Sequence, residues 1–338
     1  MELQVIWFFL WGLLWAAFFM TDGFDLGVGT LYPFLGRDET DKRKMINAIG
    51  PLWDGNEVWL ITAGGVTFAA FPLVYATMFS SLYTPLMFIL FGLIIRGVSF
   101  EFRGLSESAL WKKTWDVSIF VGSFVPALLF GVAFANIFMG LPIDGKGILH
   151  GNLLTLLNPY GIMGGLLFVL LFMQHGALWL CIRTGEDLQV RAIRTVRMLW
   201  PIVLVVLAVF VVASAFYTDL FANYLATPIL FAVPVLAVCA FIGVRILLGK
   251  ARYFAAWGMS AAGIVATTFF GVIGLFPNLF PSSLDPAYSL SAMNASSSPL
   301  TLTIMLWVVA FLVPLVIAYQ AWAYYTFRFK VEKEDFTY

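Results

Sequence analysis

A long apolar run opens with Gly50-Pro51-Leu52-Trp53-Asp54-Gly55-Asn56-Glu57-Val58-Trp59-Leu60 and continues to Tyr75. Pro51 suits the first turn of a helix, because the N–H that proline lacks would have no partner there. Asp54 and Glu57 stand three residues apart and therefore lie on one face of that helix. An acid inside a bilayer costs roughly 2.5–3.5 kcal/mol at mid-depth. The stretch predicts a membrane helix whose two carboxylates either serve a function or pair with the helix dipole.

Composition places the whole chain in the membrane class. Of its 338 residues, 61% are hydrophobic and only 11% are charged, whereas soluble proteins are about half apolar and about a quarter charged. The formal net charge is zero, so the charge balance gives no reason to expect a nucleic-acid partner. Cys181 and Cys239 both fall in apolar runs, where they form neither a disulfide framework nor a spaced metal motif.

Nine apolar runs are long enough to cross about 30 Å of hydrocarbon. The sequence therefore predicts an all-α, polytopic membrane protein with nine transmembrane helices. Residues 1–338 are expected to form a single integral membrane domain with no soluble domain. The predicted spans are 3–34, 51–75, 77–100, 115–139, 157–182, 197–217, 227–248, 254–276 and 300–326.

Basic residues set the expected orientation of these spans. Of the 19 Lys and Arg residues, all but Lys146 fall in connections, or at adjoining span ends, on one side of the predicted membrane. Because cytoplasmic loops carry the excess of Lys and Arg, this side is expected to be cytoplasmic. The N-terminus is then outside and the C-terminus is cytoplasmic.

A second acidic pair lies on the first span. Asp22 and Asp25 are again three residues apart and sit near the cytoplasmic end of that span. The second span runs in the opposite direction, so Asp54 and Glu57 lie in its cytoplasmic third. The two pairs are therefore expected to converge at one depth, with Arg96 of the third span available to neutralise them.

Two readings of this convergence remain open on the sequence alone. The acids form either a buried ion-pair knot that fixes helix packing or a polar path that takes protons from the cytoplasm. A secondary ion-coupled transporter is the alternative class, with the acids as coupling sites. Transporters often carry broken helices near the midplane, whereas these acids lie nearer the inner face.

Two other features bear on packing and cofactors. Gly23 and Gly27 form a small-xxx-small pair, which lets another helix pack closely. His150 lies in a predicted outer loop and His175 in the fifth span, so the two are separated in depth. Membrane haems use axial His, Met or Cys ligands, and we therefore expect no haem-binding residue in this chain and no metal site. Trp59 lies deeper than a tryptophan of the interfacial belt should.

Two stretches closely resemble subunit II of cytochrome bd-type quinol oxidases. They are Thr21–Gly29 and Trp53–Gly65. The likeness continues, in order along nearly the whole chain, through Gly122–Pro126, Leu157–Gly161 and Met293–Ser296.

The resemblance implies a subunit of the bacterial cytoplasmic (inner) membrane, built as two four-helix bundles plus one further helix. It implies pairing with a homologous, haem-bearing subunit I and, as in many members, with small single-span accessory subunits, in contact with membrane lipid and quinone. Haems b and d and the quinol-oxidising loop belong to subunit I, which agrees with the scarcity of histidine here. The complex oxidises quinol and reduces dioxygen to water. Subunit II has no directly catalytic residue, supports assembly, and in some members holds a structural quinone.

Individual residues carry the resemblance further. Asp54 matches the aspartate of the family's proton path, and Asp22 and Asp25 match its first-helix acids. Glu57 departs from members that have a glutamine there and adds a titratable group to the path. Trp59 matches the tryptophan near the oxygen route. The expected proton path is thus Asp54, Glu57, Asp22 and Asp25.

Overall fold

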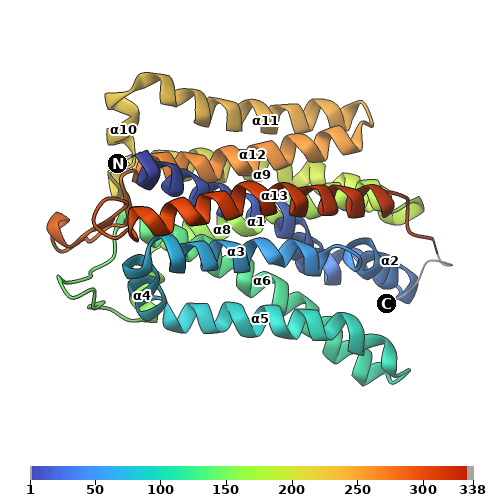
Figure 1. The fold of residues 1–338 in the computed structure, drawn as a ribbon. Helices are drawn as coiled ribbons and strands as arrows, with labels where there is room; N and C mark the ends of the chain where they lie inside the picture. The colour runs from blue at the N-terminus through green and yellow to red at the C-terminus, as the bar shows by residue number, and fades with distance from the viewer. Residues whose placement is uncertain (1, 333–338) are drawn as a thin grey trace.

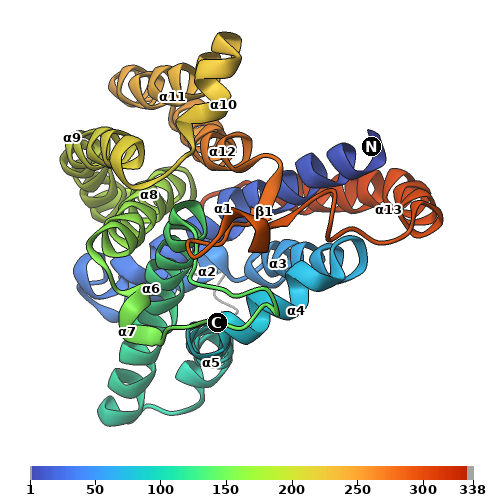
Figure 2. The same cartoon turned by 90° about the vertical axis from the view of Figure 1, so that its left-hand side faces the viewer.

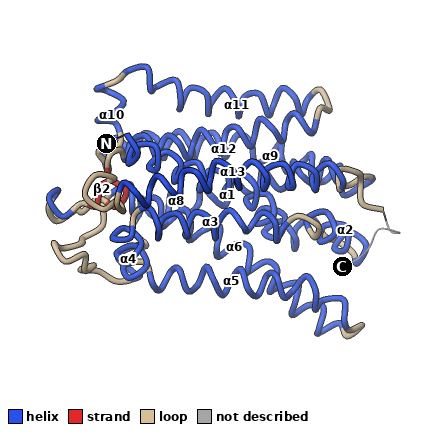
Figure 3. Tube along the Cα trace, viewed as in Figure 1, coloured by secondary structure: helices blue, strands red, loops and turns tan. Residues whose placement is uncertain are grey.

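The computed structural model describes residues 2–332 as a bundle of long helices that run roughly along one axis (Figures 1 and 3). This confirms the all-α fold class. The long helices are α1 (Glu2–Leu35), α3 (Trp53–Ala70), α5 (Tyr83–Phe102), α6 (Ala109–Met139), α8 (Pro159–Arg183), α9 (Glu186–Tyr217), α11 (Ala232–Gly249), α12 (Tyr253–Leu275) and α13 (Pro299–Thr326). The shorter helices are α2 (Glu39–Ile49), α4 (Pro72–Ser81), α7 (Leu153–Leu156) and α10 (Phe221–Ala226).

Local sequence signals explain several helix starts. Asn158 caps α8 by accepting from the N–H of Gly161, and Pro159 occupies the first turn. Ser298 and Pro299 do the same for α13. Side-chain oxygens at the N-cap satisfy backbone donors that the helix leaves unpaired, and proline needs no partner there. α6 and α9 begin earlier than the apolar runs at 115 and 197, because their first turns are polar but still helical.

The second predicted span is divided in the structure. α3 ends at Ala70, Phe71 is non-helical with φ −134° and ψ 65°, and Pro72 begins α4. Proline disfavours the helical conformation in the residue before it, so the break falls earlier than the predicted end at Tyr75. α4 turns across the end of the bundle before α5 returns along it (Figure 1).

Within residues 2–332, eight helices are long and apolar enough to cross a membrane. α3 is the long helix outside this set, because its first turns carry Asp54, Asn56 and Glu57. It nevertheless runs along the bundle beside α1 (Figure 1). Each predicted span therefore contains one long helix, and α4 crosses the boundary between the second and third predicted spans. The count of nine crossings and the orientation remain predictions.

The long helices pack as one continuous bundle, with α6 against α8 and with α13 at the edge beside α1 and α3 (Figure 2). α5 packs on α6, α9 on α8, and α11 on α12; the division into two four-helix bundles remains a prediction. α1 lies at the centre and packs on α3, α6, α8 and α12. The predicted close packing at its glycines is confirmed: a Cβ on Gly27 would lie 1.8 Å from the carbonyl oxygen of Phe172 on α8.

The two ends of the bundle differ in character. One end holds α4, α10, the antiparallel strands β1 (Asn278–Phe280) and β2 (Leu290–Ser291), and the loop around Lys146 (Figures 1 and 2); we call it the loop end. The other end holds α2 and the ion pairs of Lys42, Arg103 and Arg191; we call it the basic end. Lys333, one of the basic residues behind the predicted orientation, lies outside the described residues.

Candidate functional site

Arg96 on α5 is the centre of a buried charged cluster. Its guanidinium is fully buried, and its Nη2 donates to Asp22 Oδ1 of α1 over 2.9 Å and to Glu57 Oε1 of α3 over 2.5 Å. Asp22 is also fully buried, whereas the Glu57 side chain is 21% exposed. The predicted meeting of the two acidic spans with Arg96 is therefore confirmed for Asp22 and Glu57.

Asp25 joins the cluster through an amide. Asn56 Nδ2 of α3 donates to Asp25 Oδ2 over 2.7 Å, and Tyr324 Oη of α13 donates to Asn56 Oδ1 over 2.9 Å. Asp25 and Asn56 are buried. A hydrogen-bonded chain thus connects α13, α3 and α1 beside the Arg96 ion pairs.

The cluster has unused hydrogen-bonding capacity. Asp22 Oδ2, Asp25 Oδ1 and two guanidinium nitrogens of Arg96 are buried and have no hydrogen-bond partner among the described residues. Buried polar atoms are usually paired, so these unpaired atoms set the cluster apart from ordinary buried polar groups. Asp22 and Glu57 share the Arg96 guanidinium, whereas Asp25 is held by Asn56.

The structure places Asp54 outside this cluster. Asp54 is exposed in the first turn of α3 and makes no hydrogen bond or ion pair with another described residue. It lies on the outer side of the helix with Val58 and Ile61, which are also exposed. The expectation that Asp54 and Glu57 converge together on Arg96 is therefore wrong for Asp54. A spacing of three residues leaves a rotation of about 60° between side chains, which here separates an inward acid from an outward one.

Trp59 lies inside the bundle, one turn beyond the acids. It is buried, and its Nε1 donates to Gln320 Oε1 of α13 over 2.8 Å. Gln320 Nε2 in turn donates to the carbonyl of Gly55 over 2.6 Å. Trp59 lines an apolar cavity of about 390 Å³ between α1, α3, α12 and α13, together with Thr21 and Tyr324. Trp59 is therefore an interior residue of the bundle, and its depth in the membrane remains a prediction.

The two histidines are engaged within the chain. The ring nitrogens of buried His175 lie 3.0 Å from Ser260 Oγ and 3.0 Å from the carbonyl of Met20. His150 Nε2 lies 2.9 Å from Asp144 Oδ2 in a loop at the loop end. The absence of a haem ligand in this chain remains a prediction.

Comparison with known proteins decides the family. The family model described as cytochrome bd terminal oxidase subunit II matches residues 3–327. The chain belongs to this family. It is 41% identical over 338 residues to cytochrome bd ubiquinol oxidase subunit 2 of Bacillus subtilis (strain 168), covering 100% of this chain and 99% of that protein. It is 38% identical over 368 residues to cytochrome bd-I ubiquinol oxidase subunit 2 of Escherichia coli (strain K12), covering 98% and 96%.

A solved structure supports the fold. The bd oxidase from Geobacillus thermodenitrificans includes a chain that aligns with a TM-score of 0.78 at 15% identity, covering 96% of this chain and 99% of that one. This likeness concerns the fold alone. Together with the eight apolar helices, family membership makes this subunit II a multi-pass membrane protein.

Two residues of this subunit II were not singled out from the sequence as site residues. Gln320 and Tyr324 are one turn apart on α13 and both reach α3. Their signal is a polar pair at i, i+4 inside an otherwise apolar span. Their partners on α3 lie more than 250 positions away, so the sequence pattern alone does not identify them.

A second network closes the basic end. Asp116 of α6 accepts from Tyr32 Oη at 2.9 Å, Lys42 Nζ at 2.7 Å and Arg103 Nε at 2.6 Å. Arg103 also forms two hydrogen bonds to Glu39 of α2, and these lower the pKa of the Glu39 carboxyl. The network ties α1, α2 and α6 to Arg103, the residue that follows α5.

Proposed function

We propose that this chain is the haem-free subunit of a quinol:dioxygen oxidoreductase in the bacterial cytoplasmic membrane. Haems b and d and the quinol-oxidising site lie in a homologous subunit I, and this chain supports its assembly and supplies a proton path from the cytoplasm. The names of the relatives as ubiquinol oxidase subunits support the activity. The observation that carries the proton role is the buried Arg96 cluster, which gathers three acids near the basic end.

The chemistry requires such a path. Dioxygen reduction to water consumes protons, hydrocarbon conducts none, and carboxyl groups with waters relay protons through membrane proteins. Glu57 is partly exposed and bridges to buried Asp22 through Arg96. Protons therefore enter the cluster at Glu57, and the buried carboxyl groups of Asp22 and Asp25 hold them.

Asp54 has a different place in the proposed path. Its exposed side chain lies on the outer face of α3, which continues into exposed Ile61 and Phe68. α13 beside it is almost wholly exposed, with Leu302 as its one buried residue. Large exposed apolar faces mark contacts with protein or lipid, and we assign α13 and the first turns of α3, which carry Asp54, to subunit I. Asp54 then passes protons across the boundary between the subunits.

The cavity beside Trp59 is assigned to the oxygen route. Dioxygen is small and apolar, and this cavity is lined mainly by apolar side chains between α1, α3 and α13. Its volume also accommodates the ring of a structural quinone, the ligand that the resemblance implies for some members. A bound quinone would occupy the route, so the two roles exclude each other in one complex.

The test is Asp54→Asn in the assembled oxidase, which preserves shape and hydrogen bonding but removes titration. We expect normal haem content with quinol-driven oxygen consumption lower by at least about tenfold, because a group that transfers protons is lost. Asp187→Asn, an exposed acid in the first turn of α9, is the matched control. Wild-type turnover in a normally assembled Asp54→Asn oxidase would refute the path and leave the ion-pair knot. Family membership sets the transporter alternative aside.

A further inference from the structure

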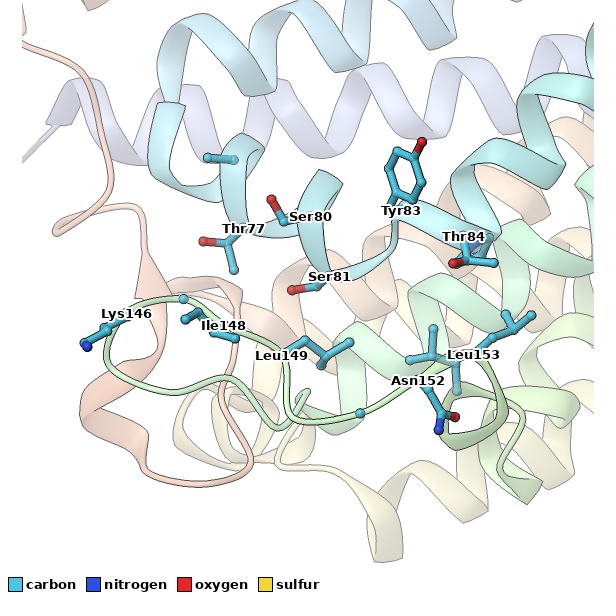
Figure 4. A pocket seen from close by; sticks show the side chains of 15 residues that line it. Thr77, Ser80, Ser81, Tyr83, Thr84, Lys146, Ile148, Leu149, Asn152 and Leu153 are labelled. Carbon is cyan, nitrogen blue, oxygen red and sulfur yellow. The ribbon is translucent and has the colours of Figure 1, made fainter.

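A polar pocket opens at the loop end of the bundle, away from the acid cluster. It has a volume of about 600 Å³ and lies between the junction of α4 with α5 and the loop that leads into α7 (Figure 4). Side-chain hydroxyls form much of one wall. These belong to Thr77, Ser80, Ser81 and Thr84.

One of these hydroxyls is built into the pocket without a partner. Ser81 is only 8% exposed, and its Oγ is buried and has no hydrogen-bond partner among residues 2–332. Thr77 beside it is 9% exposed. A buried hydroxyl without a partner costs free energy, so a ligand that accepts a hydrogen bond here is favoured.

The opposite wall supplies a positive charge. Lys146 lies at the rim of the pocket, with its side chain directed away from the labelled hydroxyls (Figure 4), and it forms no salt bridge within the described chain. The nearby Asp144 is already engaged, because it accepts from His150 and from the backbone N–H groups of Lys146 and Ile148. Lys146 is also the one Lys or Arg residue of the described chain in the loops of this end. Hydroxyl donors in a pocket that has the flexible side chain of an unpaired lysine at its rim are complementary to a phosphate group.

An apolar groove begins on the other side of the same junction. It has a volume of about 560 Å³ and runs between α3, α4 and α5. Tyr83 lines both the pocket and the groove, and its ring points away from the Lys146 loop (Figure 4). Gly64 and Gly65 form part of the groove wall, and a Cβ at either position would meet nothing within 4 Å. The polar pocket, with Lys146 at its rim, thus adjoins the apolar groove.

We propose that the pocket binds the phosphate headgroup of a glycerophospholipid whose acyl chain passes Tyr83 into the groove between α3 and α5. The headgroup accepts from the hydroxyls of Thr77 and Ser81 and pairs with Lys146. The acyl chain covers apolar surface that would otherwise be open beside α3. A free phosphate compound would occupy the polar pocket but not the apolar groove. The groove beside the pocket is therefore the reason for assigning a lipid.

The experiment uses the assembled complex in detergent and a phosphatidylglycerol that carries a photoactivatable diazirine midway along one acyl chain. After illumination, we expect labelled peptides from the groove, within residues 60–93. The combined Ser81→Ala and Lys146→Ala variant should lower this labelling by about tenfold, the factor expected for loss of a charge-assisted contact. Excess sn-glycerol 3-phosphate should not displace the lipid, since it lacks the chain that fills the groove.

A second variant tests the groove separately. Gly64→Leu places a side chain into open space and should reduce labelling without a clash in this chain. Gly258→Leu is the matched control, because Gly258 on α12 also faces open space but lines neither the pocket nor the groove. Three results would overturn the proposal: labelling outside the groove, labelling that neither variant changes, or displacement by sn-glycerol 3-phosphate. Failure of Gly64→Leu to assemble with subunit I, with labelling unchanged in the headgroup variant, would instead show that the partner fills the groove.

Discussion

Arg96 Nη2 donates to Asp22 Oδ1 over 2.9 Å, and both side chains are fully buried. The same nitrogen contacts Glu57 of α3, so one guanidinium holds acids from two other helices. A buried charge that loses its partner costs far more than the pair gains when it forms. The cluster therefore fixes the arrangement of α1, α3 and α5 as well as serving the proposed path.

The first prediction concerns this cation. Arg96→Leu should lower the stability of the assembled complex by roughly 3–5 kcal/mol, because Asp22 and Glu57 lose the cation with which they pair. Arg96→Lys retains the charge and should recover part of the loss. The measurement is thermal unfolding and yield of the complex, with Arg252→Leu, at an exposed position, as control. Equal stability of Arg96→Leu and the control would show that the ion pairs contribute nothing net.

The second prediction concerns haem. His150→Ala and His175→Ala together should leave every haem absorption band of the assembled oxidase unchanged, per complex. The His175 ring is engaged by Ser260 and the Met20 carbonyl, and His150 lies in a loop at the loop end, where it contacts Asp144. Yield is expected to fall, since a buried ring is lost. Disappearance of one band from complexes that do assemble would place a haem ligand in this chain.

The third prediction concerns pH and the loop at the loop end. A hydrogen bond from His150, and then the N–H groups of Ile148 and Lys146, lower the pKa of Asp144 from 3.8 to about 2. A lowered pKa in the folded state means that the stabilisation is present above about pH 4 and is lost as the pH falls towards about 2. Amide-exchange protection of Lys146 and Ile148, corrected for intrinsic rates, should decline across that window.

The control for this loop is Asp144→Asn, which cannot titrate. Its protection at Lys146 and Ile148 should be lower at neutral pH and should not change between about pH 4 and about 2. Protection that falls equally in the wild type and in Asp144→Asn would assign the effect to another group.

The sequence predicted the parts of this architecture that depend on periodicity and charge sign. Apolar run lengths located the long helices, and Gly23 and Gly27 indicated a close contact with another helix, which the structure shows to be α8. The facing of Asp22 and Glu57 towards Arg96 followed from the antiparallel course of consecutive spans. The outward position of Asp54 did not follow, because a spacing of three does not say which of two acids lies nearer the neighbouring helix. That choice depends on how α3 is rotated, which its packing against α1 and α13 decides.

Contacts of α13 show the second limit of sequence reasoning. Trp59 and Gln320 are separated by 261 positions, and nothing local to either residue identifies the other. Pro72 explains the helix break at Phe71. The sequence nevertheless predicts that the span ends later, at Tyr75, because the apolar run continues to that residue without interruption.

The last prediction tests how α13 acts on the acid cluster. Tyr324→Phe keeps the ring but removes the hydroxyl that donates to Asn56, which itself donates to Asp25. Loss of one such hydrogen bond should cost about 0.5–1.5 kcal/mol, too little to prevent assembly. If Asn56 must be held by Tyr324 to orient towards Asp25, the pH profile of turnover should shift while haem content remains normal. Tyr319→Phe, at an exposed position of the same helix, should leave the profile unchanged. If Tyr324→Phe assembles normally and the pH profile of its turnover does not shift, then α13 has only a packing role, and the Tyr324 hydroxyl does not affect Asp25.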